Sequence, residues 1–76
     1  MIAIVDATLH GQFGYLSVQV IRDGVVVHDA ELPSQIVRAC RETYPLECQK
    51  DLARVQRMMV GLGYTVLDGE MQPVEV

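Results

Sequence analysis

The chain has 76 residues, of which 50% are hydrophobic and 21% charged, and its formal net charge is −4. This length allows a single domain over residues 1–76, and the composition is that of a globular protein rather than a disordered one. The apolar runs are too short for a transmembrane span and no signal-peptide pattern opens the chain, so we expect a cytoplasmic protein. The acidic balance disfavours nucleic acid as a partner.

The stretch MIAIVDATLHGQFGYLSVQV at the N-terminus predicts two strands joined by a loop. Residues 2–5, extending at most to residue 8, form a short apolar strand that ends near Asp6. The glycines within residues 9–14 indicate a loop. Residues 15–21 alternate apolar and polar side chains, which is typical of a half-buried strand.

A strand, an acid, a loop and a second strand in this order resemble the opening of ribonuclease-H-like and actin-like ATPase domains. That resemblance implies a metal-binding role for Asp6. Such a site needs several converging carboxylates, and the rest of a domain of that class would lie well beyond 76 residues. We therefore expect Asp6 to end a strand, and we keep a metal-dependent catalytic fragment around Asp6, His10 and His28 as a second alternative.

Residues 25–32 predict the returning strand of a hairpin, whose turn fixes the register. A two-residue turn at Asp23 and Gly24 would place acids opposite Leu16 and Val18, whereas a three-residue loop over residues 22–24 places apolar residues and a histidine there. We expect the three-residue loop. Its apolar face holds Leu16, Val18, Val20, Val26, His28, Ala30 and Leu32. The other face then carries a small apolar patch formed by Ile21, Val25 and Val27.

Two helices are predicted next, over residues 33–43 and from Pro45 through about Val60, because a proline both ends one helix and suits the first turn of another. The second helix carries an apolar stripe. The stripe consists of Cys48, Leu52, Val55, Met59 and Leu62. Gly61 and Gly63 are candidates for its C-terminal cap. Residues 64–67 predict a last strand, and residues 70–76 an additional edge strand limited by Pro73.

The element order is therefore β-β-β-α-α-β, with a possible further strand. It predicts an α+β domain of two layers, an antiparallel sheet with the helices on one face. Cys40 and Cys48 would lie about 12 Å apart on a continuous helix, too far for a disulfide, so we expect two reduced thiols. The sequence contains no phosphate-binding loop, nucleophile elbow or metal-ligand spacing, so we expect no enzyme, cofactor or metal.

The leading hypothesis is a small acidic protein that binds another protein as an inhibitor, regulator or accessory subunit, a type found among phage and mobile-element products. The candidate partner-binding residues are Tyr15, Ile21, Val25, Val27, Tyr44, Arg54, Arg57 and Met58. The alternative is a nucleic-acid-associated module that uses a basic helix face, because residues 34–60 carry five cations against three carboxylates. A homodimer is compatible with each hypothesis, since a strand edge and a helix side are left to form an interface.

Overall fold

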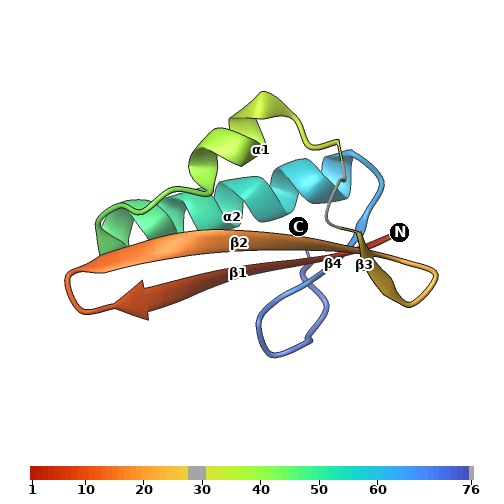
Figure 1. Cartoon of the computed structure of the whole chain (residues 1–76), viewed down its shortest axis with the longest axis horizontal. Coiled ribbons are helices and arrows are strands. Elements are labelled where there is room, and N and C mark those ends of the chain that lie inside the picture. The colour runs from red at the N-terminus through yellow and green to blue at the C-terminus, as the bar shows by residue number, and fades with distance from the viewer. Residues whose placement is uncertain (28–30, 76) are drawn as a thin grey trace.

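The computed structural model describes residues 1–27 and 31–75, which form four strands and two helices. The elements are β1 (Ile2–His10), β2 (Phe13–Arg22), β3 (Val25–Val27), α1 (Ser34–Ala39), α2 (Pro45–Gly61) and β4 (Thr65–Leu67). Both helices lie on one side of the sheet (Figure 1). The predicted α+β class and element order are confirmed.

The sheet has the strand order β3-β2-β1-β4 and is mixed rather than wholly antiparallel. The first three strands pair antiparallel, whereas β4 pairs parallel to β1 through Ile2, Ala3 and Ile4. The segment that contains α1 and α2 connects β3, at one edge of the sheet, with β4, at the other edge. A crossover of this kind returns the chain to the end at which β1 begins, which makes the last pair parallel.

The first hairpin is longer than the sequence predicts, because β1 continues to His10 and β2 begins at Phe13. The predicted loop over residues 9–14 is therefore wrong, and only Gly11 and Gln12 lie outside the strands. Gly11 has φ = 64°, as a two-residue turn with glycine in its first central position requires. Asp6 consequently lies within β1 and does not end it, contrary to our expectation.

The second hairpin corrects the predicted register. Asp23 (φ = 53°) and Gly24 (φ = 78°) form a two-residue turn with both central residues at positive φ, the geometry that Asp-Gly favours. Val20 pairs with Val27 and Ile21 with Val26, so the three-residue loop is wrong.

The predicted strand over residues 25–32 ends at Val27 among the described residues, and the expected core positions His28 and Ala30 lie outside them. The one-residue shift changes which side chains share a face. Ile21 shares its face with Val26, whereas Val25 and Val27 lie on the face of Val20. The predicted patch of Ile21, Val25 and Val27 therefore does not exist.

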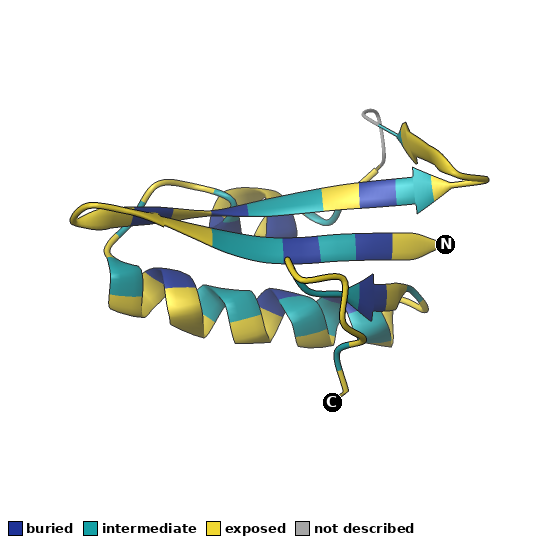
Figure 2. Ribbon diagram, turned by 90° about the horizontal axis from the view of Figure 1, so that it is seen from below, coloured by how far each residue is buried: buried dark blue, intermediate teal, exposed yellow. Residues whose placement is uncertain are grey.

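A small core between the sheet and the helices unites both layers (Figure 2). Its buried side chains are Ala3, Val5, Leu16, Val20, Ile36, Ala39, Cys48, Val55, Met59 and Val66. Of the predicted stripe on α2, Cys48, Val55 and Met59 are fully buried. Leu62 is 52% exposed, because α2 ends at Gly61 and Leu62 caps it.

The first helix is shorter than predicted, since α1 ends at Ala39 and not near residue 43. The following segment is held against β2 by two backbone hydrogen bonds. The Gly14 N–H donates to the Thr43 carbonyl at 2.8 Å, and the Thr43 N–H donates to the Gly14 carbonyl at 2.9 Å. This bridge fixes the start of α2, where Pro45 occupies the first turn as predicted.

We expect the substitution Gly14→Ala to lower the free energy of unfolding by about 1–3 kcal/mol, because Gly14 is buried beneath α2. A Cβ at this position would lie 2.9 Å from Leu9 Cδ2 and 3.2 Å from Cys48 Sγ. Urea denaturation followed by circular dichroism measures the effect. Gly61→Ala is the control, since a Cβ there meets no atom within 4 Å. Equal stability of the two variants would contradict the close packing of α2 on Gly14.

The residues after β4 form a loop on the side of the sheet opposite the helices (Figure 1). Asp68 Oδ1 accepts hydrogen bonds from the N–H groups of Glu70 and Gln72, each at 2.9 Å. Gly69 packs directly against the Asp6 carboxylate. The predicted edge strand is reduced to a single bridge between Leu67 and Pro73.

Candidate functional site

Three aromatic side chains gather at the end of the molecule formed by the β1–β2 turn. The bridge between Gly14 and Thr43 brings the residue after Thr43, Tyr44, beside β2. The rings of Phe13 and Tyr44 stack with centroids 5.9 Å apart and planes inclined by 25°. Phe13 and Tyr15 alternate with the buried Gly14 and Leu16, so both point away from α2. We call Phe13, Tyr15 and Tyr44 the aromatic surface.

The aromatic surface is well exposed to solvent. Phe13 is 43% exposed, Tyr15 45% and Tyr44 67%. They are three of the four aromatic residues of the chain, so most of its aromatic side chains lie outside the core. Leu9 (52% exposed) and Leu46 (73%) lie nearby along the chain. The aromatic surface therefore has a large exposed apolar area, and the backbone bridge between Gly14 and Thr43 fixes the position of Tyr44 relative to β2.

The sequence predicted Tyr15 and Tyr44 as separate candidates, and the structure places both at the same end of the molecule. Phe13 was missed because the predicted loop over residues 9–14 gave it no fixed direction. The remaining strand candidates lie elsewhere. Ile21 lies near the other end of β2, while Val25 is 65% exposed and Val27 half-buried at the edge of the sheet.

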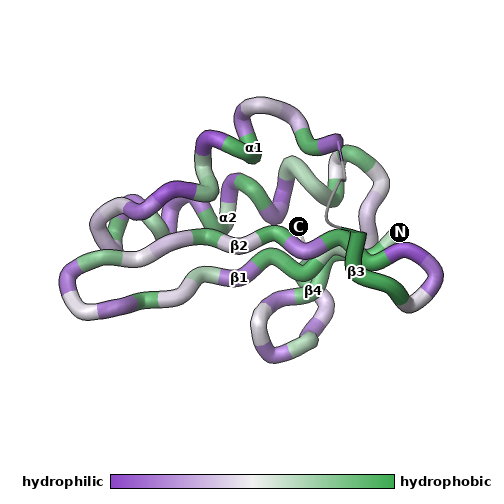
Figure 3. The backbone as a smooth tube through the Cα atoms, viewed as in Figure 1, coloured by the Kyte–Doolittle hydropathy of each residue, from purple (hydrophilic) through white to green (hydrophobic). Residues whose placement is uncertain are grey.

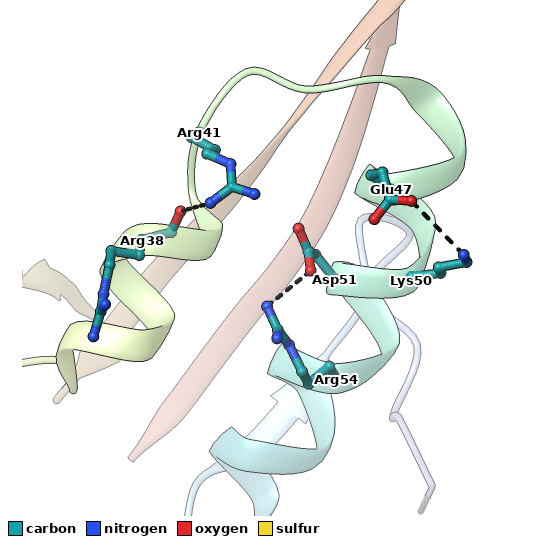
Figure 4. Close-up of polar contacts among 6 residues, drawn as sticks. All are labelled: Arg38, Arg41, Glu47, Lys50, Asp51 and Arg54. Carbon is teal, nitrogen blue, oxygen red and sulfur yellow. Dashed lines mark hydrogen bonds and ion pairs between the residues drawn. The ribbon is translucent and has the colours of Figure 1, made fainter.

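Of the candidates on α2, only Arg54 lines a polar hollow of about 400 Å³ between α1 and α2. Its lining residues are Gln35, Arg38, Ala39, Arg41, Glu47, Asp51 and Arg54. Arg54 donates to Asp51 at 2.8 Å, and Lys50 lies 3.7 Å from Glu47 (Figure 4). Arg57 is exposed, whereas Met58 is half-buried and packs against the core, so Met58 does not extend an exposed helix surface.

The side chains considered for chemistry are not brought together. His10 ends β1 opposite Phe13 and is exposed. Asp6 lies four residues away on the same face of β1, about 13 Å along an extended strand, which prevents a dyad. Among residues 1–27 and 31–75, no group of three His, Cys, Asp or Glu side chains could hold a metal ion. His28 lies outside the described residues.

Both cysteines are reduced, as the sequence predicts. Cys48, on the buried side of α2, is fully buried, and Cys40 is half-buried. Burial raises the pKa of both thiols, and for Cys48 the negative charge of Asp51 raises the pKa further. A raised pKa lowers the thiolate fraction at neutral pH, so neither thiol has the character of a nucleophile.

We expect iodoacetamide at pH 8 to modify Cys48 at least ~100-fold more slowly in the folded chain than in urea, because alkylation requires an exposed thiolate. Cys40 should react before Cys48, since it is partly exposed. Peptide mass spectrometry over time measures both rates. Faster modification of Cys48 than of Cys40 would contradict the burial of Cys48.

Comparisons with protein-family models, with curated proteins and with solved structures found no match for this chain. Among the described residues, no helix combines the length and apolar character needed to cross a membrane.

Proposed function

We propose that the chain is a protein-binding module that contacts another protein through the aromatic surface and acts as an inhibitor, regulator or accessory subunit. Tyr and Phe are enriched at the centres of protein interfaces, where charged residues are depleted. The observation that carries the proposal is the exposed stack of Phe13 on Tyr44. When a partner covers an exposed aromatic ring, the apolar surface of the ring is removed from water, and this removal favours binding.

The backbone around the aromatic surface supports binding with little reorganisation. Tyr44 is fixed by the Gly14–Thr43 bridge, and Phe13 and Tyr15 belong to the ladder between β1 and β2. A ring that is already stacked loses less side-chain freedom on binding than an isolated one. Because less free energy is spent on ordering side chains, a preorganised surface binds with higher affinity for the same contacts.

A nucleic-acid partner is supported less well by the same side chains. Bases stack on exposed aromatic rings, but such sites also require a positively charged groove for the backbone phosphates. The hollow between α1 and α2 includes Glu47 and Asp51 beside its arginines, and Asp51 is paired with Arg54. The net charge of −4 adds a repulsive field.

The test is capture of a partner on immobilised chain from a lysate of cells that make it, with quantitative mass spectrometry. A variant carrying Phe13→Ser and Tyr44→Ser is compared with Val37→Ser, which removes a 56% exposed apolar side chain from α1. We expect the wild-type chain and Val37→Ser to recover the same protein, and the double variant to recover at least ~10-fold less. Circular dichroism establishes that both variants fold.

Equal recovery by the double variant, or no protein above the blank resin, would contradict the proposal. A gel-shift assay with single-stranded DNA and RNA at low salt tests the alternative, since phosphate contacts give strongly salt-dependent binding. A shift that disappears with Arg54→Glu and Arg57→Glu would support the nucleic-acid module instead.

A further inference from the structure

The outer edge of β1 is paired with another strand over only part of its length. β4 pairs with residues 2–4, whereas β1 continues to His10. The loop after β4 borders the next part of β1, because Gly69 packs against the Asp6 carboxylate. Residues 7–10 have β2 on one side and, among the described residues, no strand on the other. We call residues 7–10 the open edge.

The backbone of the open edge directs hydrogen-bonding groups outward at every second residue. Leu9 lies opposite Gly14, whose N–H and C=O both bond to Thr43 outside the hairpin, at 2.8 and 2.9 Å. Opposite residues of an antiparallel pair either bond to each other or both face outward. The N–H and C=O of Leu9 therefore point away from β2, and those of Ala7, two residues earlier, do the same.

Other outward-facing groups of the sheet have partners within the chain. The Val5 carbonyl accepts a hydrogen bond from the Gln56 side chain on α2 at 3.4 Å, and the outer edge of β4 is bridged to Pro73. Within the described part of the chain, the outward groups of Ala7 and Leu9 have no such partner. Two donors and two acceptors of the main chain are thus open to an incoming strand.

The open edge also lacks the features that usually protect an exposed strand. Exposed edges are normally blocked by charged side chains, by proline or by a bulge. Residues 7–10 contain no proline and no Lys, Arg, Asp or Glu, and the β1–β2 register continues through them without a bulge. The open edge is therefore a ready template for another strand.

We propose that the open edge binds an extended segment of a partner protein, which joins the sheet as an added strand beside β1 and in line with β4. Such a strand makes four main-chain hydrogen bonds with Ala7 and Leu9. A similar stretch on β2, at Leu16 and Val18, is bounded at both ends by the Gly14–Thr43 bridge and by β3. The open edge has no such boundary toward the β1–β2 turn.

The position of α2 favours a partner segment over a second copy of this chain. α2 runs alongside β1 on the side of β4, where Gln56 reaches the outer edge of β1 (Figure 2). A two-fold axis between two antiparallel β1 strands stands perpendicular to the sheet. Both copies of α2 would then lie on the same face of the sheet and collide above the shared edge. A segment that carries no helix there avoids this collision.

The surroundings of the open edge define the side chains that the segment needs. Leu9, on the face of β1 that the helices cover, is 52% exposed. Leu52 is half-buried one turn before Gln56, on the same side of α2. Figure 3 shows mixed hydrophobic and hydrophilic colouring along the outer half of β1. The segment therefore requires apolar residues at alternate positions toward α2, and polar residues on the face of Thr8 and His10.

Selection of a phage-displayed library of random dodecapeptides on the immobilised chain supplies the probe, which is the most enriched peptide made synthetically. We expect this peptide to alternate apolar and polar residues. Amide hydrogen exchange of the isotope-labelled chain, followed by NMR, should slow at least ~10-fold at Ala7 and Leu9 when the peptide binds. The amides of Thr8 and His10 already face β2 and should change less.

Leu9→Pro and Leu9→Val form a matched pair. Proline removes an N–H that faces away from β2 and is tolerated at such edge positions, whereas valine keeps the N–H and a side chain of similar size. We expect Leu9→Pro to weaken peptide binding at least ~10-fold and Leu9→Val to stay within about threefold of wild type. Circular dichroism establishes that both variants fold.

Methylation of the peptide's own nitrogens gives a test that leaves the chain unchanged. Because a strand directs every second N–H toward its neighbour, methylation at one alternate set of nitrogens should abolish binding, and methylation at the other set should not. This series and the exchange of Ala7 and Leu9 decide the result if Leu9→Pro does not fold.

The inference rests on the backbone of β1 and does not depend on the aromatic surface. The double variant Phe13→Ser with Tyr44→Ser should therefore bind the peptide as wild type does, which separates a failure of the proposed function from a failure here. No enriched peptide, equal effects of the two methylation sets, or exchange that slows elsewhere but not at Ala7 and Leu9 overturns the inference. A folded Leu9→Pro variant that binds as tightly as Leu9→Val also overturns it.

Discussion

Replacing Ile36 with alanine is expected to lower the free energy of unfolding by about 2–5 kcal/mol. Ile36 is fully buried, and it and Ala39 are the only buried residues of the six-residue α1. A helix this short has no stability of its own, so its place on α2 depends on these contacts. A 76-residue domain has a total stability of only about 4–11 kcal/mol, which makes the loss a large part of the whole.

Val37→Ala is the matched control for this prediction, because Val37 is the next residue of α1 and is 56% exposed. Urea denaturation of both variants should give a much lower midpoint for Ile36→Ala and an almost unchanged midpoint for Val37→Ala, with similar m-values. Similar midpoints for the two variants would show that α1 is not anchored by Ile36.

Replacing Tyr44 with alanine is expected to weaken binding of the proposed partner by about 2 kcal/mol or more, which corresponds to roughly 30-fold in Kd. The substitution removes the most exposed ring of the aromatic surface and leaves Phe13 without its stacking partner. The hydrogen bonds between Gly14 and Thr43 involve backbone atoms only, so the fold should persist.

Tyr44→Phe separates the ring from its hydroxyl group. If stacking and apolar area carry the binding energy, Tyr44→Phe should retain affinity within about threefold of wild type, since only one hydrogen bond is at stake. Isothermal titration calorimetry with the captured partner measures both variants. Unchanged affinity in Tyr44→Ala would remove Tyr44 from the interface.

The sequence predicted the elements that depend on local patterns. The helix α2 was predicted from Pro45, Glu47 and the apolar stripe, and these signals act within one or two turns. The hairpin register was not predicted correctly, because the prediction followed the apolar pattern of an assumed strand over residues 25–32 and not the turn preference of Asp23 and Gly24. The positive φ angles of Asp23 and Gly24 fix the register instead.

The candidate site was predicted only in part for a related reason. Tyr15 and Tyr44 are conspicuous as single aromatic residues, but their proximity depends on the pairing of Gly14 with Thr43 across nearly thirty residues. No local pattern encodes such a bridge. The order in which β4 joins the sheet beside β1 is likewise a property of the whole chain and not of any one segment.

NMR titration of the isotope-labelled chain with the captured protein decides whether the aromatic surface contacts a partner protein. We predict that the first amide signals to shift or broaden are those of Phe13, Tyr15, Thr43 and Tyr44. The signals of Gln35 and Arg38 on α1 should change little. Changes centred on α1 and the hollow between the helices, with the aromatic surface unaffected, would contradict it.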